Sequence, residues 1–394
     1  MTSEWRTIRA ADFIDFNPRL SLKKGDIATK VAMDKLKPFT KKIPETEKAE
    51  FNGGAKFCNG DTVMARITPC LENGKTAYVD MLDDGEIGFG STEFIVMRAK
   101  TGISDPQFVY YTAINPVFRN VAVKSMVGSS GRQRVQQSVL EELELSVPDL
   151  DEQRRIGDFL ARIDEKIALN DRINDNLEQQ AQSYFQELFV DNADPEWAIG
   201  TISDLGTVVG GSTPSKAKPE YYTESGIAWI TPKDLSNNKS KFVSHGENDI
   251  TELGLRNSSA SIMPEGTVLF SSRAPIGYIA IAAGEVTTNQ GFKSVVPKPE
   301  IGTPFVYFFL KNTLPVIEGM ASGSTFKEVS GSTMKNVPAV IPDAETLAKF
   351  SDFCAPIFAQ QRILEEQNQS LATLRDNLLP KLMSGEIDVS AVQL

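Results

Sequence analysis

Hydrophobic residues recur at helical spacing through a long segment in the middle of the chain. Between Asp151 and Phe189 there is no proline, and Gly157 is the only glycine. The apolar stripe consists of Ile156, Phe159, Leu160, Ile163, Ile167, Ile173, Leu177, Tyr184, Phe185 and Leu188. Residues three and four apart share one face of an α-helix, so this spacing predicts a long amphipathic helix. Asp149, which follows a proline, suits the start of that helix.

A second helical stripe lies near the C-terminal end of the sequence and is less regular. It consists of Phe350, Phe353, Ile357, Leu364, Leu371, Leu378 and Leu382. Asp343 stands at its start, again after a proline. Pro356 and Pro380 fall inside the stripe, and a proline in a helix interior removes a backbone hydrogen bond. We therefore expect this second helix to be kinked or broken.

The two helical segments belong to an internal duplication. Shifted by 194 positions, residues 126–189 fall on 320–383 without a gap. The matched residues include Met126 and Met320, Val135 and Val329, Pro148-Asp149 and Pro342-Asp343, and Leu188 and Leu382. A repeat of this length is the duplication of a whole module, not a solenoid of short units.

We expect the two helices to pack on each other, antiparallel, as a long spacer. Asn170, Asn174 and Asn368 interrupt the apolar seam, and polar seam residues can fix register and pairing. A helix of roughly 35 residues spans about 50 Å, which is longer than one small domain needs. The alternative is that each helix only closes its own domain.

The segments before the two helices have a different pattern. Short β-branched runs, separated by Gly, Pro and Asn, occupy 61–67, 93–99, 266–272 and 292–297. Short helices are expected at 105–115 and 303–313. The fold class is therefore α+β with a pseudo-two-fold duplication. Its four parts are a first head (1–148), a first spacer helix (149–195), a second head (196–342) and a second spacer helix (343–394).

The negative charge is concentrated in the helical segments. Of the net charge of −11, residues 149–195 contribute −7 and residues 343–394 contribute −4, whereas the two heads are near neutral. Charge balance bears on association rather than on fold, so the heads remain free to carry a local basic patch. There is no apolar run long enough for a membrane span, and no signal-peptide core or disulfide framework. A bacterial or archaeal cytoplasm is the simplest setting.

Most catalytic constellations are missing from the sequence. His245 is the only histidine, which excludes histidine triads and multi-histidine metal sites within this chain. Gly74-Lys75-Thr76 imitates the end of a phosphate loop, but Pro69 stands where that motif needs glycine. The [DN]PP[FY] motif of amino-methyltransferases is absent as well. The chain is therefore expected to bind rather than to catalyse.

Polar and basic clusters in the heads are the positive signals. Residues 19–43 hold eight basic residues against two acidic ones, and such a cluster can neutralise phosphates. GSSGRQRV at 128–135 occupies the place where the repeat puts SGSTFKEV at 322–329. Its glycines and serines allow close backbone approach to phosphates, and its arginines can reach phosphates or base edges. The alternatives are an ordinary solvated face and a turn that feeds the spacer helix.

The stretch 210–235, with its Gly-rich turn, lysines and clustered aromatics, resembles the target-recognition domain of the specificity subunit of Type I restriction-modification systems. Similar segments are SSRAPIG (271–277), TNQGFKSV (288–295), VPDLDEQRRIGDFLARIDEKI (147–167) and LRDNLLPKLMSGEI (374–387). The resemblance covers the whole chain. The second copy departs from the first, with Thr346-Leu347 where the first has Glu152-Gln153.

The resemblance implies a non-catalytic subunit that gives sequence specificity to a multisubunit DNA methyltransferase and restriction enzyme. Each head would read one half of an asymmetric two-part site in double-stranded DNA, mainly in the major groove. The helices would set the gap, on the order of 15 base pairs for a helix of about 50 Å. They would also dock two methyltransferase subunits, with restriction subunits as further partners. S-adenosylmethionine, magnesium and ATP would belong to those partners.

Candidate site residues follow from the clusters and the resemblance. For DNA binding they are Lys23, Lys24, Lys30, Arg66, Ser129, Arg132, Gln133 and Arg134 in the first head. In the second head they are Ser212, Thr213, Ser215, Lys216, Lys218, Arg273, Lys293, Ser324 and Lys327. For partner contact they are Ile156, Phe159, Ile163, Ile167, Leu177, Phe353, Ile357, Leu364 and Leu371. No catalytic or metal-binding residue is expected.

Two other function classes remain open on the sequence alone. The chain could be a structural adaptor in a phage-defence complex, with heads that hold proteins rather than DNA. Binding to a methyltransferase without any DNA preference would favour that class. The chain could also be an enzyme in its own right, which methylation or cleavage by the purified single chain would indicate.

Overall fold

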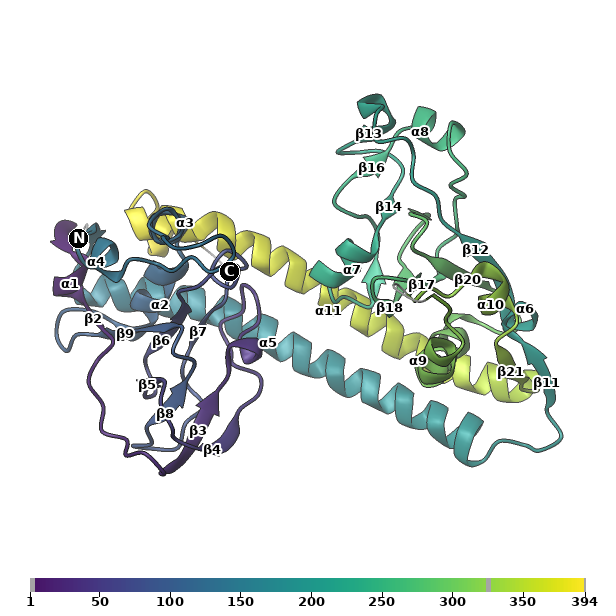
Figure 1. The fold of residues 1–394 in the computed structure, drawn as a ribbon, viewed down its shortest axis with the longest axis horizontal. Helices are drawn as coiled ribbons and strands as arrows, with labels where there is room; N and C mark the ends of the chain where they lie inside the picture. The colour runs from purple at the N-terminus through teal and green to yellow at the C-terminus, as the bar shows by residue number, and fades with distance from the viewer. Residues whose placement is uncertain (1–3, 324–326, 393–394) are drawn as a thin grey trace. The chain divides into compact units, whose positions relative to one another are not determined.

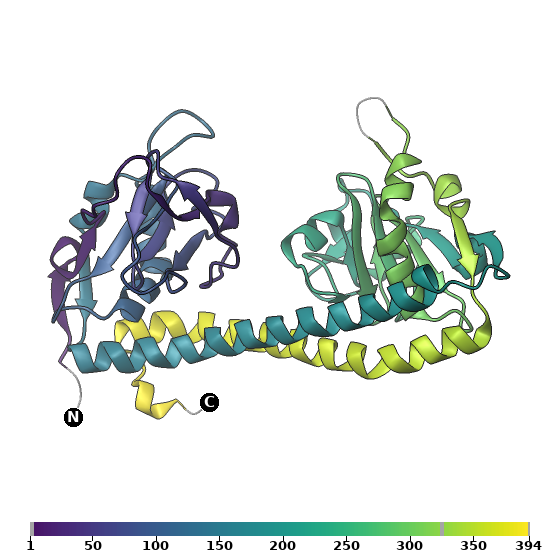
Figure 2. The ribbon, with the colours of Figure 1, turned by 90° about the horizontal axis from the view of Figure 1, so that it is seen from below.

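The computed structural model describes residues 4–323 and 327–392. The chain forms two compact units. Unit 1 comprises residues 1–169 together with 367–394, and unit 2 comprises residues 170–366. Each unit therefore holds one head and a part of each long helical segment (Figures 1 and 2). None of the described helices is long and apolar enough to cross a membrane.

Head 1, in unit 1, is built from short strands and helices, as the β-branched runs between turns predict. Its strands are β1 (Arg6–Arg9), β2 (Ile14–Phe16), β3 (Ile27–Val31), β4 (Glu47–Glu50), β5 (Ala55–Phe57), β6 (Thr62–Ala65), β7 (Thr76–Tyr78), β8 (Gly88–Gly90), β9 (Phe94–Ala99) and β10 (Glu144–Val147). Its helices are α1 (Ala10–Phe13), η1 (Met33–Lys35), α2 (Pro106–Ile114), α3 (Pro116–Lys124) and α4 (Gln137–Glu141); η4 (Val389–Ala391) lies near the C-terminus.

Two four-stranded sheets form the body of head 1, in the orders β2-β9-β6-β7 and β4-β3-β8-β5. The first is antiparallel, with Val63 opposite Val96 in the β6–β9 ladder. Both of these side chains are buried. A two-stranded sheet, β1-β10, connects the N-terminal strand to the strand that leads into the first long helix. The short helix expected at 105–115 is α2, whose N-cap Asp105 accepts hydrogen bonds from the amides of Gln107 and Phe108.

Head 2, in unit 2, is also built from short strands and helices, but its strands form a different set of sheets. Its strands are β11 (Ala198–Thr201), β12 (Gly206–Gly210), β13 (Tyr222–Thr223), β14 (Trp229–Ile230), β15 (Phe242–Val243), β16 (Asp249–Ile250), β17 (Val268–Ser272), β18 (Ile276–Ala282), β19 (Thr287–Thr288), β20 (Lys293–Pro297) and β21 (Pro338–Ile341). Its helices are α6 (Ile202–Leu205), η3 (Pro219–Tyr221), α7 (Pro232–Asn237), α8 (Glu252–Arg256), α9 (Thr303–Gly319) and α10 (Gly331–Lys335).

The main sheet of head 2 has five strands in the order β12-β20-β17-β18-β15. Three two-stranded sheets, β11-β21, β13-β16 and β14-β19, surround it. Helix α9 is the short helix expected at 303–313, and it continues to Gly319. Its aromatic side chains, Phe305 and Phe308, pack with Phe185 and Phe350 of the long helices in one core.

The two predicted long helices are α5 (Leu150–Gln186), which continues into the π-helical turn η2 (Glu187–Asp191), and α11 (Ala344–Ser384). The predicted starts are confirmed. The carboxylate of Asp149 accepts the amide hydrogen of Glu152 at 2.9 Å, and that of Asp343 accepts the amide hydrogen of Thr346 at 2.9 Å.

Of the two outcomes expected for the second helix, the break is wrong, because α11 runs without interruption through Pro356 and Pro380, whereas a kink stays a prediction. A proline removes one backbone hydrogen bond but does not prevent a helix whose flanking residues are held by tertiary packing. Cys354 and Ile357 are buried on either side of Pro356, and Leu379 and Leu382 are buried on either side of Pro380.

Within each unit, the segments of α5 and α11 pack antiparallel, as predicted. In unit 1, Asn368 donates a hydrogen bond to the carbonyl of Ile167, and Arg375 pairs with Asp164 farther along α11. In unit 2, Gln361 donates to the carbonyl of Asn174, while Phe350, earlier in α11, contacts Phe185. In both cases a rising residue number on α11 meets a falling one on α5. Figure 2 shows the two helices side by side in each unit.

Candidate nucleic-acid interface

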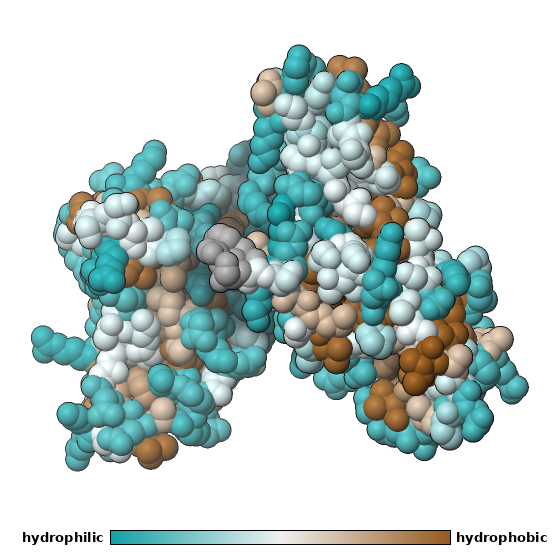
Figure 3. All heavy atoms as spheres, turned by 45° about the vertical axis from the view of Figure 1, so that its right-hand side comes forward, coloured by the Kyte–Doolittle hydropathy of each residue, from teal (hydrophilic) through white to brown (hydrophobic). Residues whose placement is uncertain are grey.

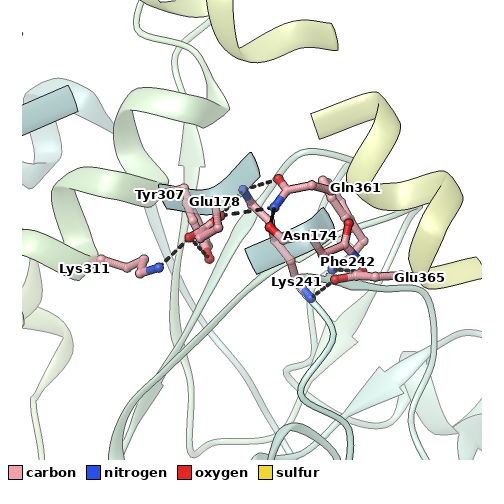
Figure 4. Close-up of polar contacts among 8 residues, drawn as sticks. All are labelled: Asn174, Glu178, Lys241, Phe242, Tyr307, Lys311, Gln361 and Glu365. Carbon is pink, nitrogen blue, oxygen red and sulfur yellow. Dashed lines mark hydrogen bonds and ion pairs between the residues drawn. The ribbon is translucent and has the colours of Figure 1, made fainter. Parts of the chain in front are cut away.

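A partly buried polar cluster connects head 2 to the long helices in unit 2 (Figure 4). The ammonium of Lys241 lies 2.8 Å from Glu178 Oε2 on α5 and 2.9 Å from Gln361 Oε1 on α11. Lys311 on α9 binds the other oxygen of Glu178, which also accepts the hydroxyl of Tyr307 at 3.1 Å. Burial alone would raise the pKa of Glu178, but the two lysines outweigh it and lower that pKa to about 2.

Burial has the dominant effect on the lysine of this cluster. It lowers the pKa of Lys241 to about 8, although Glu178 acts in the opposite direction. Glu365 of α11 caps the strand that follows Lys241, because it accepts the amides of Lys241 and Phe242 at 2.7 and 3.0 Å. The cluster therefore connects α5, α9, α11 and the segment at β15 through two ion pairs to Glu178 and the hydrogen bonds around them.

Unit 1 contains a comparable cluster built from different residues. Asp164 of α5 accepts the hydroxyl of Tyr111 at 2.6 Å and lies 2.7 Å from Nη1 of Arg375 on α11. Tyr111 in turn accepts a hydrogen bond from Lys41, whose pKa is lowered to about 8 by burial. These contacts hold head 1 on its own pair of helix segments.

Each head carries a hollow with several polar side chains in its lining. In head 1 the hollow has a volume of about 570 Å³ and is lined by residues that include Asn17, Arg19, Lys56, Arg66 and Thr92. In head 2 it has a volume of about 490 Å³ and is lined by residues that include Thr213, Lys216, Lys233, Arg273, Asn289 and Gln290. Such linings offer several donors and acceptors to a polar ligand.

Backbone hydrogen bonds show that the two hollows use corresponding parts of the repeat. In head 1 the amide of Arg66, directly after β6, donates to the carbonyl of Glu93, directly before β9. In head 2 the amide of Ser272, at the end of β17, donates to the carbonyl of Gly291, shortly before β20. The same two strand ends therefore border both hollows, while the side chains around them differ.

The candidate residues of head 1 lie in three places. Lys23 and Lys24 are exposed on the loop between β2 and β3, and Lys30 of β3 pairs with Glu47 at 2.7 Å. Arg66 lines the hollow. Ser129, Arg132, Gln133 and Arg134 lie on the loop that follows α3, where Ser129, Arg132 and Arg134 are exposed and Gln133 is half-buried.

The basic cluster at 19–43 does not form one continuous basic face. Lys41 is buried beneath the head, and Lys35 and Lys42 each bind a carboxylate, of Glu45 and Asp80 respectively. Of this cluster, Arg19 is the residue that lines the hollow. Local charge in the sequence therefore overstated the positive surface, because folding pairs or buries several of these lysines.

The candidate residues of head 2 converge more closely. Thr213, Lys216 and Arg273 line the hollow, and Ser212 precedes it. Ser215 and Lys218 are exposed on the same loop, and Lys293 and Lys327 lie near Glu328 and Arg273. Ser324 lies outside the described residues.

Several lining residues were missed by the sequence candidates. In head 2 they are Lys233, Asn289 and Gln290, and in head 1 they are Asn17, Arg19 and Lys56. Asn289 and Gln290 stand inside the segment 288–295, which carried part of the family resemblance, so that motif was the available signal. Lys56 stands alone in the sequence, and nothing in its surroundings there indicates the hollow.

The predicted partner-contact residues lie along the helix pairs. Ile156, Ile163, Ile357 and Leu364 are buried within their own units, and Phe159, Ile167, Leu177 and Leu371 are half-buried. Phe353 is 38% exposed and packs against the ring of Tyr184, with centroids 4.5 Å apart. On the face shown in Figure 3, hydrophobic residues form small groups among hydrophilic ones.

The family comparison agrees with the duplicated architecture. The sequence model of the Type I restriction modification DNA specificity domain matches residues 3–179 and again 195–374. The Type I restriction enzyme MjaIX specificity subunit of Methanocaldococcus jannaschii is 39% identical over 194 residues, an alignment that spans 47% of this chain and 45% of the relative. The HindI specificity subunit of Haemophilus influenzae is 25% identical over 407 residues, spanning 83% of this chain and 86% of the relative.

A solved structure has the same fold. The S subunit of the Type I restriction-modification system from M. genitalium superposes with a TM-score of 0.59 at 17% identity, covering 96% of each chain. The two family matches together span most of the sequence, one match for each copy of the repeat. The chain belongs to the family of DNA specificity subunits of Type I restriction-modification systems, the non-catalytic part of those enzymes.

Proposed function

We propose that this chain reads an asymmetric two-part site in double-stranded DNA, one half with each head. The observation that carries the proposal is the pair of polar hollows, which share a backbone framework but differ in their lining. Arginine suits the acceptor pair of guanine, and asparagine or glutamine suits adenine in the major groove. Head 2 offers Arg273, Asn289 and Gln290, whereas head 1 offers Arg19, Arg66 and Lys56. Different linings imply different half-sites.

The proposed DNA contacts divide by environment. The exposed cations on loops near the hollows, Lys23, Lys24, Arg132, Lys216, Lys218 and Lys327, are placed to neutralise phosphates. The hydroxyl groups of Ser129, Ser212, Thr213 and Ser215 suit phosphate or base-edge contacts. The remaining candidates, Lys30, Arg66, Gln133, Arg134, Arg273, Lys293 and Ser324, complete the proposed set. Arg66 and Arg273 border the hollows and are the proposed base readers.

The long helices are proposed to hold two methyltransferase subunits and to set the gap between half-sites. Their acidic surfaces favour protein contact over DNA contact, because anionic helices repel phosphates. Under this proposal the predicted partner-contact residues determine how the two helix segments pack, and the packed helices bind the methyltransferase subunits. Restriction subunits join the same complex. S-adenosylmethionine, magnesium and ATP would be bound by the partners, in the cytoplasm. The four functional parts of the chain would be the first head (1–148), the first spacer helix (149–195), the second head (196–342) and the second spacer helix (343–394).

The first experiment is a genome-wide map of methylated adenines in cells with and without this gene. The expected result is a two-part asymmetric motif that disappears on deletion. In cells that carry Arg273→Ala, methylation should fall with discrimination lost at one half of the motif, since one good bidentate base contact is worth about 1–3 kcal/mol. An unchanged methylome, with the partner genes expressed, would overturn the proposal in favour of an adaptor with protein-binding heads.

A further inference from the structure

Each head has an arm, the loop between its last head helices, that returns to the same place on the sheet. Arm 1 is residues 127–135, and arm 2 is the repeat-equivalent segment, of which 321–323 and 327–329 are described. The amide of Val135 donates to the carbonyl of Arg66 at 2.8 Å, and the amide of Val329 donates to the carbonyl of Ser272 at 3.0 Å. Because Val135 and Val329 are 194 positions apart, the arms are attached at equivalent points.

One residue before each attachment, the arm makes an ion pair with the body of the head. In head 1, Arg134 binds the carboxylate of Glu93 with two nitrogens, Nε at 2.9 Å and Nη2 at 2.6 Å. Arg66 lies 3.9 Å from the same carboxylate. In head 2 the arm residue is Glu328, which lies 3.5 Å from Arg273 and 3.7 Å from Lys293.

The polarity of this contact is reversed between the heads. Arg134 and Glu328 are equivalent in the repeat, so arm 1 supplies the cation and arm 2 supplies the anion. The body residues come from the same two strand ends: Arg66 follows β6 and Glu93 precedes β9, while Arg273 follows β17 and Lys293 begins β20. The arm and the body of the head therefore attract each other in both heads, although the arm residue is positive in one head and negative in the other. A positive charge on the arm is not common to the two heads.

The exposure of the Arg134–Glu93 pair indicates that it affects the arm rather than the stability of the whole protein. The side chain of Arg134 is 45% exposed and that of Glu93 is 24% exposed, and pairs of this kind contribute little to global stability. Their effect falls on the arm instead, whose hairpin is closed by the hydrogen bonds between Val127 and Arg134 at 3.0 and 2.9 Å. The guanidinium of Arg132, by contrast, is exposed and has no side-chain partner within the described residues.

We propose that the Arg134–Glu93 pair and its reversed counterpart at Glu328 position the arms on the heads, and that Arg132, not Arg134, is the DNA-contacting arginine of arm 1. This inference rests on the proposed reading of DNA by the heads and refines it, because it removes Arg134 from the proposed DNA contacts. Arg134 is thus a positioning residue. Its charge acts on Glu93, and the arm then presents Arg132 at the edge of the head.

Charge reversal in head 1 tests the positioning role without DNA. Hydrogen exchange of the full chain measures how often the arm opens, through the amides of Val127 and Arg134. Arg134→Glu should speed their exchange roughly ten-fold, because an attraction is lost and a repulsion is added. Arg134→Glu combined with Glu93→Arg recreates the polarity of head 2 and should restore slow exchange. Arg6→Glu, the same change at another exposed arginine of head 1, should leave the arm unaffected.

The DNA test uses the complex with its methyltransferase and a duplex that carries the mapped site. Arg134→Glu should weaken binding, and the charge-swapped double variant should recover to within about three-fold of the original chain, since the arm is back in place. Arg132→Ala should weaken binding with normal exchange and lower the salt dependence by about one unit of slope. Arg134→Gln provides a neutral variant should the reversed charge disturb folding.

The outcomes test the positioning role of Arg134 separately from the proposed reading of DNA. Fast exchange in the double variant would overturn the positioning role. Restored exchange with binding still as weak as in Arg134→Glu would mean that the cation at 134 meets DNA, which also overturns the inference. If the unaltered complex showed no preference for any duplex, the reading of DNA would fail, whereas the exchange data would still decide whether the pair holds the arm.

Discussion

Single polar residues of unit 2 contribute, beside the aromatic core, to the attachment of head 2 to the helices. Glu178 accepts contacts from Lys241, Lys311 and Tyr307, and removal of its charge leaves the buried ammonium of Lys241 without a carboxylate. Breaking one side of a buried pair is strongly destabilising because the remaining charge is uncompensated. We expect Glu178→Gln to lower the free energy of unfolding by about 3 kcal/mol in denaturant titration. Glu187→Gln, an exposed position nine residues on, is the matched control, and an equal loss there would contradict the prediction.

The same carboxylate predicts a response to acid. Its pKa in the folded chain is about 2, against an ordinary value of 4.5, so the unfolded chain takes up the proton first as pH falls. The stabilisation is therefore complete above pH 4.5 and is lost as pH falls toward 2. Between pH 7 and pH 3 it should shrink by about 2 kcal/mol. The fall in unfolding free energy between these two pH values should be about 2 kcal/mol smaller in Glu178→Gln than in the original chain, because other carboxylates such as Glu86, whose pKa is also about 2, titrate in both chains.

At the residue scale the sequence could not indicate these contacts. Lys241 is 63 positions from Glu178, and Gln361 is 183 positions from it, so no local spacing connects them. Local charge also gave a wrong indication of exposure at Lys41. This residue stands in a basic cluster of the sequence but is buried against the rings of Tyr110 and Tyr111. Which cation is paired, buried or free depends on tertiary contacts.

At the scale of elements, the spacing of hydrophobic residues predicted the secondary structure better than composition did. The stripes predicted both long helices, and the aspartates after Pro148 and Pro342 predicted their starts. The prolines led to the wrong expectation of a break, since burial of residues such as Phe350 and Ile357 outweighs the lost hydrogen bond. The loops that line the hollows have no period, so residues such as Lys56 and Lys233 could not be predicted from the pattern.

An unbroken α11 predicts the effect of restoring an amide. Pro356 is exposed, and alanine would supply the missing hydrogen-bond donor and a better helix former. We expect Pro356→Ala to keep or raise the free energy of unfolding, by up to about 3 kcal/mol. Thermal denaturation of the two chains checks this, with Ala355→Gly as the control that should lower stability by about 1 kcal/mol. Loss of stability in Pro356→Ala would indicate that the helix depends on a proline-induced bend.

At the scale of the whole molecule, the duplicated halves exchange helix segments. Unit 1 takes residues 367–394 from the second copy, and unit 2 takes residues 170–189 from the first. The ion pairs that attach each head to the helices also combine residues of the two copies. Arg375 of the second copy pairs in unit 1, and Glu178 of the first copy pairs in unit 2. Their repeat-equivalent positions hold Ala181 and Ala372, which cannot form either ion pair. The two copies are therefore complementary at these ion pairs.

This complementarity predicts effects confined to one unit. Arg375→Ala leaves the buried Asp164 with Tyr111 but without its cation, and breaking such a pair costs about 3–5 kcal/mol. Hydrogen exchange should show lost protection in α2 and in residues 150–169 and 367–384, while β17 and β20 keep theirs. Glu178→Gln should give the opposite distribution. If Ala181→Arg restored protection in the Arg375→Ala chain, the two helix segments would be interchangeable. We expect no rescue, because residue 181 lies in unit 2, beside the aromatic core formed by Phe185 and Phe305.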